Sequence, residues 1–296
     1  MNRLAWPVML LLTLPFLANG GSEDPARQIN WAINDAPPFH IIDGPYKRKG
    51  FCDALMQGLI DEMSEVRHEV LVIPAARIAQ LRKAQAPVCF PCMIKRNDTD
   101  TTLYTDATLY YRPHVLIANP QSAKIIETRY GNPVRFAELL QDQSLAFGRP
   151  LGRRYGEHLQ PLIDQYADRH ESHRQLSGKA PTLAVQRMVG LGRLDYTLDY
   201  QVVGRYSELS QQTQLAYLQI AENRQSHIIG AVGCSRTDWG EQAVQQINQA
   251  LPDVLTSTDY LTNLQLWFGE GEEHFWPQYR QKVLGSRQSH GHLSMK

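Results

Sequence analysis

Segments with the period of a strand and segments with the period of a helix alternate along most of this chain, and this alternation constrains its fold most. Such alternation predicts an α/β fold with mostly parallel sheets, whose ligands bind outside the carboxyl ends of the strands. The periodicity predicts strands at 29–33, 70–73, 88–94, 114–118, 145–147, 195–199, 215–220 and 228–232, and helices at 51–63, 75–84, 134–140, 154–167, 181–190, 241–251, 260–268 and 274–283.

Length and composition narrow the class of protein. The chain has 296 residues, of which 43% are hydrophobic and 20% charged, so it can bury the cores of two ordinary lobes. Lys and Arg total 30, and Asp and Glu also total 30. A balanced charge argues against a nucleic-acid-binding protein and against a polybasic membrane-surface protein, since both need a basic surplus. No apolar stretch is long enough for a membrane span.

The first twenty residues have the order of a secretory signal peptide. A short basic start is followed by a mostly apolar run at 7–18 and by small residues before a cut after Gly20. The alternative is a buried first helix, but Pro7 and Pro15 oppose a continuous helix. No cysteine follows the apolar run, so a lipid anchor is not expected. The sequence therefore predicts a signal peptide at 1–20 and a soluble, periplasmic mature protein.

Export would place the four cysteines, Cys52, Cys89, Cys92 and Cys234, in an oxidising compartment. In an oxidising compartment an even number favours disulfides, and the connectivity stays open. Cys89 and Cys92 also have the C-x-x-C spacing of redox enzymes, but that motif begins a helix, whereas these residues read as a strand. Free buried thiols are the remaining alternative, and no second close pair is present for a zinc site.

Several short motifs together resemble bacterial extracellular solute-binding proteins of family 3. They are WAINDAPPF at 31–39 followed by Asp43-Gly44, GFCDAL at 50–55, PAARIAQL at 74–81, GRLDY at 192–196, and Trp239-Gly240 with INQAL at 247–251. Each motif is loose, but their order and spacing match over about residues 29–282. The similarity is greatest to a poorly characterised subgroup without a known transporter partner.

The resemblance implies a two-lobe type II periplasmic binding protein fold with a hinge of two crossing segments. Lobe one would comprise 27–115 and 226–285, lobe two 116–225, and the polar residues 286–296 would form a disordered tail. The strand that returns to lobe one and ends at Cys234 would lie beside the strand of Cys89 and Cys92, so we expect at least one disulfide there. Such lobes close on a ligand by hinge bending.

Amino-acid-binding members of this family hold the ligand carboxylate with an Arg and its ammonium with an Asp. The position of the Arg falls near Thr99, with Arg96 three residues early, and the position of the Asp falls at Tyr200, with Asp199 one residue short. A shift of one residue along a strand turns a side chain to the opposite face. Both groups therefore look absent, unless a gap in a loop restores them.

The remaining candidate ligand-binding residues are aromatic, polar or basic. The Gly-rich turn at 148–156 carries Arg149, Arg153 and Arg154 between a strand and a helix, which favours an anionic group; a solvated basic loop is the alternative. For the aromatic positions the alternative is core packing. The predicted ligand-binding residues are Trp31, Asp35, Phe39, Arg77, Tyr110, Arg149, Tyr155 and Tyr200.

The sequence thus predicts a non-catalytic receptor that closes on a small polar or aromatic, anionic ligand, for transport or signalling. It would be a monomer without cofactor or metal, with an inner-membrane permease or sensor as its partner. Two alternatives stay open: an amino-acid transport receptor, and a periplasmic enzyme similar to cyclohexadienyl dehydratase, for which Asp35 and Asp199 are the candidate acids. The histidines at 290 and 292 have the spacing of a metal chelate, but a solvated tail is the favoured interpretation.

Overall fold

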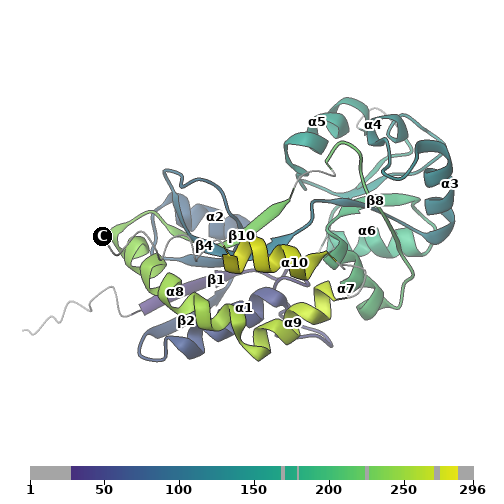
Figure 1. Ribbon diagram of the computed structural model, residues 1–296. Coiled ribbons are helices and arrows are strands. Elements are labelled where there is room, and N and C mark those ends of the chain that lie inside the picture. The colour runs from purple at the N-terminus through teal and green to yellow at the C-terminus, as the bar shows by residue number, and fades with distance from the viewer. Residues whose placement is uncertain (1–27, 168–170, 179, 224–226, 270–273, 286–296) are drawn as a thin grey trace, which may run out of the picture.

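The computed structural model describes residues 28–167, 171–178, 180–223, 227–269 and 274–285, which form two α/β lobes (Figure 1). The predicted signal peptide at 1–20 and the predicted tail at 286–296 lie outside these residues. In the described part of the chain, no helix is long and apolar enough to cross a membrane. The α/β class predicted from the sequence is confirmed.

Lobe one is built on a five-stranded sheet in the order β2-β1-β3-β10-β4. β1 pairs in parallel with β2 and β3, whereas β10 is antiparallel to both β3 and β4. The prediction of mostly parallel sheets is therefore only half right here, because the returning strand runs against its neighbours. The strands are β1 (Gln28–Ile33), β2 (Arg67–Val72), β3 (Cys89–Ile94), β4 (Thr102–Tyr111) and β10 (Ile228–Ser235).

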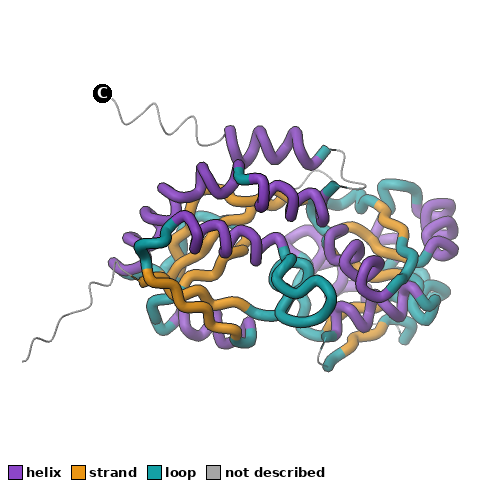
Figure 2. Tube along the Cα trace, turned by 90° about the horizontal axis from the view of Figure 1, so that it is seen from below, coloured by secondary structure: helices purple, strands orange, loops and turns teal. Residues whose placement is uncertain are grey.

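Helices cover both faces of this sheet because its central strands are apolar on both sides. In β1, Trp31 and Ile33 belong to the main core, while Ala32 faces the other way and packs with Ile78. The tube view in Figure 2 shows helices lying over the strands of this sheet. The helical elements are α1 (Phe51–Glu62), α2 (Ala75–Lys83), α8 (Asp238–Thr256), α9 (Thr258–Phe268), α10 (Phe275–Tyr279) and a π-helix (Arg280–Leu284).

Lobe two has a three-stranded antiparallel sheet in the order β8-β5-β9 and a short parallel pair of β6 and β7. The strand predicted at 145–147 forms at 148–150, and the helix predicted at 134–140 shrinks to α4, because Val134 instead pairs with Ile220. The elements are β5 (Val115–Ala118), α3 (Pro120–Tyr130), α4 (Phe136–Leu139), β6 (Gly148–Pro150), α5 (Gly156–Tyr166), β7 (Arg174–Leu176), α6 (Pro181–Gly190), β8 (Tyr196–Asp199), α7 (Gln201–Gln211) and β9 (Ala216–Leu218).

The chain passes between the lobes between β4 and β5 and again between β9 and β10. The two passages lie side by side, since the Asn223 side chain donates a hydrogen bond of 3.2 Å to the carbonyl of His114. A third contact joins the lobes: the Arg205 guanidinium on α7 donates to the carbonyl of Leu266 on α9, at 3.0 Å. The N-terminal half of α7 thereby packs into the core of lobe one through Val202, Val203 and Tyr206.

Two disulfides hold lobe one together. Cys89 on β3 pairs with Cys234 on β10, where the two residues are direct neighbours in the antiparallel ladder. Cys52 on α1 pairs with Cys92 on the same strand β3. The predicted bridge between the Cys89/Cys92 strand and Cys234 is confirmed, and the C-x-x-C pair is divided between two structural bridges. The sheet is therefore tied covalently both to its returning strand and to α1.

Candidate ligand-binding site at the junction of the lobes

An ion pair between Arg153 and Asp199 is the centre of the candidate site. Asp199 ends β8 and is 1% exposed, while Arg153 lies in the turn between β6 and α5 and donates to the Asp199 carboxylate from Nη2. The same carboxylate oxygen accepts the backbone N–H of Tyr200 at 2.8 Å. Burial raises the pKa of Asp199, although the Arg153 guanidinium and this N–H oppose the rise. Removed from water, this carboxylate depends on its arginine partner.

Tyr155 lies beside the ion pair, and Arg149 lies near Tyr155. Tyr155 is 2% exposed, and its hydroxyl has no hydrogen-bond partner among the described residues. Burial, with Asp199 nearby, raises the pKa of this hydroxyl, so it stays protonated and able to donate. Arg149 on β6 is also buried, at 7% exposure. An unpartnered buried hydroxyl is costly in a folded protein, and a ligand group would satisfy it.

A stack of rings extends from the ion pair to lobe one. The His114 ring, in the first passage between the lobes, stacks on Tyr200 with centroids 4.3 Å apart, and also contacts Tyr155. Tyr200 meets Tyr111 at 5.2 Å, and both contact Phe39 of lobe one. Burial and the positive charge of Arg153 lower the pKa of His114 to about 3, so its ring is neutral at physiological pH. These uncharged rings therefore form a connected series of contacts between the two lobes.

The loop that carries Phe39 is held by Asp53 in the first turn of α1. One carboxylate oxygen of Asp53 accepts the backbone N–H groups of Ile41 and Gly50, at 2.9 and 3.1 Å, and the other lies 2.7 Å from Nδ1 of His40. Gly50 is required because a Cβ there would lie 2.2 Å from the carbonyl oxygen of Phe39. The motif GFCDAL thus has a local explanation: it fixes the loop that delivers Phe39 to the junction.

The structure brings three of the predicted ligand-binding residues, Phe39, Tyr155 and Tyr200, into one cluster of ring contacts, with Arg149 beside Tyr155. The ring of Tyr110 contacts that of His227, and Tyr110 lines a cavity of about 450 Å³ together with Gln201 and with His114 of the cluster.

The other predicted residues lie in lobe one. Trp31 is fully buried in the core, where its indole N–H donates to His68 at 3.1 Å. Asp35 is exposed and accepts the N–H of Ile42 at 3.3 Å, and Arg77 is exposed on α2. Among the described residues, none of these three side chains takes part in the ring contacts of the cluster.

Four residues of the cluster were not among the predicted ligand-binding residues: Tyr111, His114, Arg153 and Asp199. The predicted basic turn already pointed to Arg153, and the comparison with the family motif already pointed to Asp199. No short-range pattern reports that a histidine in an interlobe passage will stack on a tyrosine far along the chain. Among the described residues, no group of three His, Cys, Asp or Glu side chains could hold a metal ion.

The places of the family's ligand-holding Asp and Arg have different surroundings in this chain. Asp199 is buried and already paired with Arg153, whereas Tyr200 begins α7 with its ring in the stack. Arg96 and Thr99 are both exposed and line a cavity in lobe one that includes no residue of the junction cluster. The carboxylate nearest the place of the family's Asp, that of Asp199, therefore already has a cationic partner.

Comparison with models of protein families and with curated proteins finds no match. Solved structures do match. An ancestral amino-acid-binding protein, described as a precursor of cyclohexadienyl dehydratase, has a TM-score of 0.56 and 14% identity over 82% of this chain and 95% of its own. A probable extracellular-binding protein of an amino-acid ABC transporter from Bacillus subtilis gives 0.60 and 13%, over 82% and 98%.

A histidine kinase sensor domain similar to periplasmic binding proteins matches with a TM-score of 0.59 and 15% identity, over 83% of this chain and 98% of that domain. Sequence identities this low support a shared fold and nothing more specific. The chain has the two-lobe fold of the periplasmic binding proteins, a fold that its structural neighbours use both as transport receptors and as sensor domains.

Proposed function

We propose that this chain is an exported solute-binding protein that closes its two lobes on a small ligand with a flat body and an anionic group. The observation that carries the proposal is the pairing of Asp199 with Arg153 beside the buried Tyr155 hydroxyl, which has no hydrogen-bond partner in the part of the chain that the structure describes. The architecture of the structural neighbours supports a binding role. The two disulfides of lobe one fit an oxidising compartment.

An ordinary amino acid is a poor fit to this site. Its ammonium needs a buried carboxylate, and Asp199 is already neutralised by Arg153. An ammonium could reach this carboxylate only by displacing Arg153, which gives up an ion pair whose carboxylate side chain is 2% exposed, and breaking a buried ion pair costs several kcal/mol. A micromolar complex has a total free energy of only about −8 kcal/mol. Free amino acids should therefore bind weakly or not at all.

A planar anion is a better fit, for two reasons. The Tyr155 hydroxyl is protonated at neutral pH and can donate a hydrogen bond to an anion, and the guanidinium of Arg149 lies close enough to act on this hydroxyl electrostatically. Phe39, which is partly exposed and contacts Tyr111 and Tyr200, offers a neutral ring on which an aromatic or otherwise flat body can pack. Recognition by these groups needs no carboxylate from the protein.

Native mass spectrometry of freshly purified protein tests the proposal most simply. We expect a co-purified small molecule with an acidic group, released on denaturation and retained less by the variant Tyr155→Phe. Arg193→Met is the matched control, because Arg193 is an exposed arginine of lobe two outside the cluster. A co-purified common amino acid held equally by wild type and Tyr155→Phe would contradict the proposal.

Export itself is a separate proposal. If the first twenty residues are a signal peptide, protein recovered from the periplasm begins near residue 21. N-terminal sequencing that finds Met1 on exported protein would contradict cleavage. Transport and signalling differ in the expected partner: a permease and ATPase encoded beside this chain would support transport, and a signalling gene would support a sensor role.

An enzyme on the same fold is the second candidate, since one neighbour is described as a precursor of a dehydratase and burial raises the pKa of Asp199 as a general acid requires. The ion pair with Arg153 opposes that role because it stabilises the carboxylate. Incubation with prephenate, followed by product analysis, distinguishes the two. Turnover that Asp199→Asn abolishes would establish the enzyme, and no turnover favours the receptor.

A further inference from the structure

The two passages between the lobes share a cavity, which we call the passage cavity. Its volume is about 450 Å³, within the range of about 300–1,000 Å³ that is usual for small-molecule sites. Pro113 and His114 of the first passage and Asn223 of the second passage line it, as do Gln201 of α7 and Tyr217 of β9. The cavity is therefore formed by both segments of the chain about which the lobes would rotate on closing.

The side-chain amide of Asn223 is only half satisfied. Its Nδ2 donates to the carbonyl of His114 at 3.2 Å, while its Oδ1 is buried and has no hydrogen-bond partner among the described residues. Because a carbonyl can only accept, this bond identifies the amide nitrogen and leaves the oxygen as the atom without a partner. Asn223 is 6% exposed, and a buried acceptor without a donor is costly. A molecule in the cavity with an N–H or O–H group would supply the donor.

The charges around the cavity favour an uncharged molecule. The described residues that line it include no aspartate or glutamate, so a cation would find no opposite charge there. Arg112 also lines it, but this side chain already interacts with another part of the protein. The His114 ring is neutral, since burial and Arg153 lower its pKa to about 3. An anion would bring a further acceptor to Asn223, which needs a donor.

Much of the remaining lining is apolar or aromatic. Val115, Leu218 and Ile220 line the cavity and are buried. The Tyr217 hydroxyl donates to Glu208 at 2.6 Å, so its proton is already used and the ring is what Tyr217 offers to a ligand. A water molecule could donate to Asn223 but would leave this apolar surface uncovered, whereas a donor on an apolar body would cover it.

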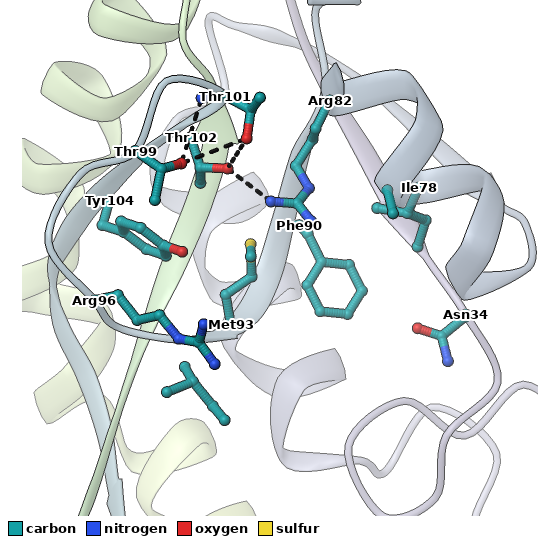
Figure 3. A pocket seen from close by; sticks show the side chains of 12 residues that line it. Asn34, Ile78, Arg82, Phe90, Met93, Arg96, Thr99, Thr101, Thr102 and Tyr104 are labelled. Carbon is teal, nitrogen blue, oxygen red and sulfur yellow. Dashed lines mark hydrogen bonds between the residues drawn. The ribbon is translucent and has the colours of Figure 1, made fainter. Parts of the chain in front are cut away.

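The cavity of lobe one that Arg96 and Thr99 line has a different character (Figure 3). There the side chains of Arg82 and Arg96 reach in from opposite sides, and Arg82 donates to the hydroxyl of Thr102 at 2.7 Å. None of the described residues lines both cavities. The passage cavity is therefore separate from the place where the family's carboxylate-binding Arg falls, and it shares only His114 with the junction cluster.

We propose that the passage cavity is a second binding site, for a small uncharged molecule that carries an N–H or O–H donor on an apolar body. The donor binds Oδ1 of Asn223, and the body packs on the apolar lining. This ligand differs in chemistry from the anion proposed for the junction. Because it contacts both passages, it restricts their motion and favours the angle between the lobes that it fits best.

Isothermal titration calorimetry with two matched probes, benzamide and acetophenone, tests the proposed donor. Both probes are flat, uncharged and nearly equal in size, but only benzamide carries N–H groups. Benzamide should bind wild-type protein about three- to tenfold more tightly, the value of one hydrogen bond between neutral groups. Asn223→Leu should weaken benzamide to the affinity of acetophenone and leave acetophenone unchanged. Equal affinities of the two probes for wild-type protein would overturn the proposal.

A second variant blocks the cavity and leaves Asn223 in place. Gln219 lines the cavity and is exposed, so Gln219→Trp should fold and should weaken both probes. Gln214→Trp is the matched control, because Gln214 is an exposed glutamine of lobe two outside the cavity and should bind as wild type does. This pair keeps the test valid even if Asn223→Leu fails to fold.

Hydrogen exchange measured by mass spectrometry locates the bound probe. Saturating benzamide should slow exchange in peptides that contain His114 or Asn223 and leave peptides of α2 unchanged. Unchanged exchange in both passages would overturn the proposal. Benzamide binding that survives Tyr155→Phe and falls in Gln219→Trp belongs to the passage cavity. The reverse pattern, or no benzamide binding to wild-type protein, would overturn the proposal and leave the proposed function of the junction standing.

Discussion

Removing Arg153 should destabilise the protein strongly at neutral pH and much less in acid. The variant Arg153→Met leaves the Asp199 carboxylate 1% exposed, and the backbone N–H of Tyr200 is then its one remaining donor among the described residues. Breaking a buried ion pair in this way costs about 3–5 kcal/mol. For a chain of this size, that lowers the melting temperature by roughly 6–20 °C.

The pH dependence follows from the sign of the pKa change. In the variant, burial acts on Asp199 without the opposing arginine, so its pKa in the folded state rises further above its unfolded value of about 4. A group whose pKa is raised by folding contributes stability below the unfolded pKa and loses it as the pH rises through the folded pKa. The difference from wild type should therefore be largest at pH 7.5 and shrink toward pH 4.5.

Urea unfolding followed by circular dichroism at these two pH values measures the effect. The double variant Arg153→Met/Asp199→Asn should recover part of the lost stability at pH 7.5, since the buried side chain at position 199 then carries no charge. His114 should contribute to the pH dependence that persists in the double variant, because burial still lowers its pKa. A free energy of unfolding that falls equally at both pH values, with no recovery in the double variant, would refute the reasoning.

Three further predictions follow from the same contacts. Wild-type stability should fall below pH 6.5, because burial holds the pKa of His114 near 3 and only the unfolded chain takes up the proton there; His114→Phe should flatten unfolding free energies measured between pH 6.5 and 4. Replacing both Cys89 and Cys234 by Ala should cost about 5 kcal/mol, against about 4 for Cys52 and Cys92, as their loops span 145 and 40 residues; equal denaturation midpoints for the two double variants would contradict the loop-entropy argument. Gly50→Ala should lower the melting temperature by several degrees, since its Cβ would strike the carbonyl of Phe39, while Gly44→Ala, where a Cβ meets open space, serves as a control strained only by its positive φ.

The sequence predicted the class of fold well because the signals for it are local. The helix at 181–190 was predicted with its observed bounds, since a proline begins it and helical periodicity continues to Gly190. The antiparallel direction of β10 was not predicted, because strand direction depends on where the chain returns and not on the residues of the strand. The long strand β4 was missed, as were the helices α3 and α7.

The candidate site was predicted only in part, for a related reason. Tyr155 and Tyr200 could be chosen because both follow predicted strands and carry side chains suited to ligands. Whether Arg153 faces solvent, a ligand or Asp199 is decided by contacts across 46 positions of the chain, and no local pattern contains them. Trp31 shows the opposite case: its aromatic side chain at a strand suggested a ligand contact, while the structure places it in the core with zero exposure.

A thermal-shift panel of the twenty amino acids and a set of aromatic and organic acids tests the central claim most directly, because a ligand that binds only the folded protein raises its melting temperature. The account predicts a shift of several degrees with at least one flat organic acid, reduced by Tyr155→Phe, and none with common amino acids. A shift of several degrees with one common amino acid, abolished by Arg96→Ala or Asp199→Ala but not by Tyr155→Ala, would contradict it.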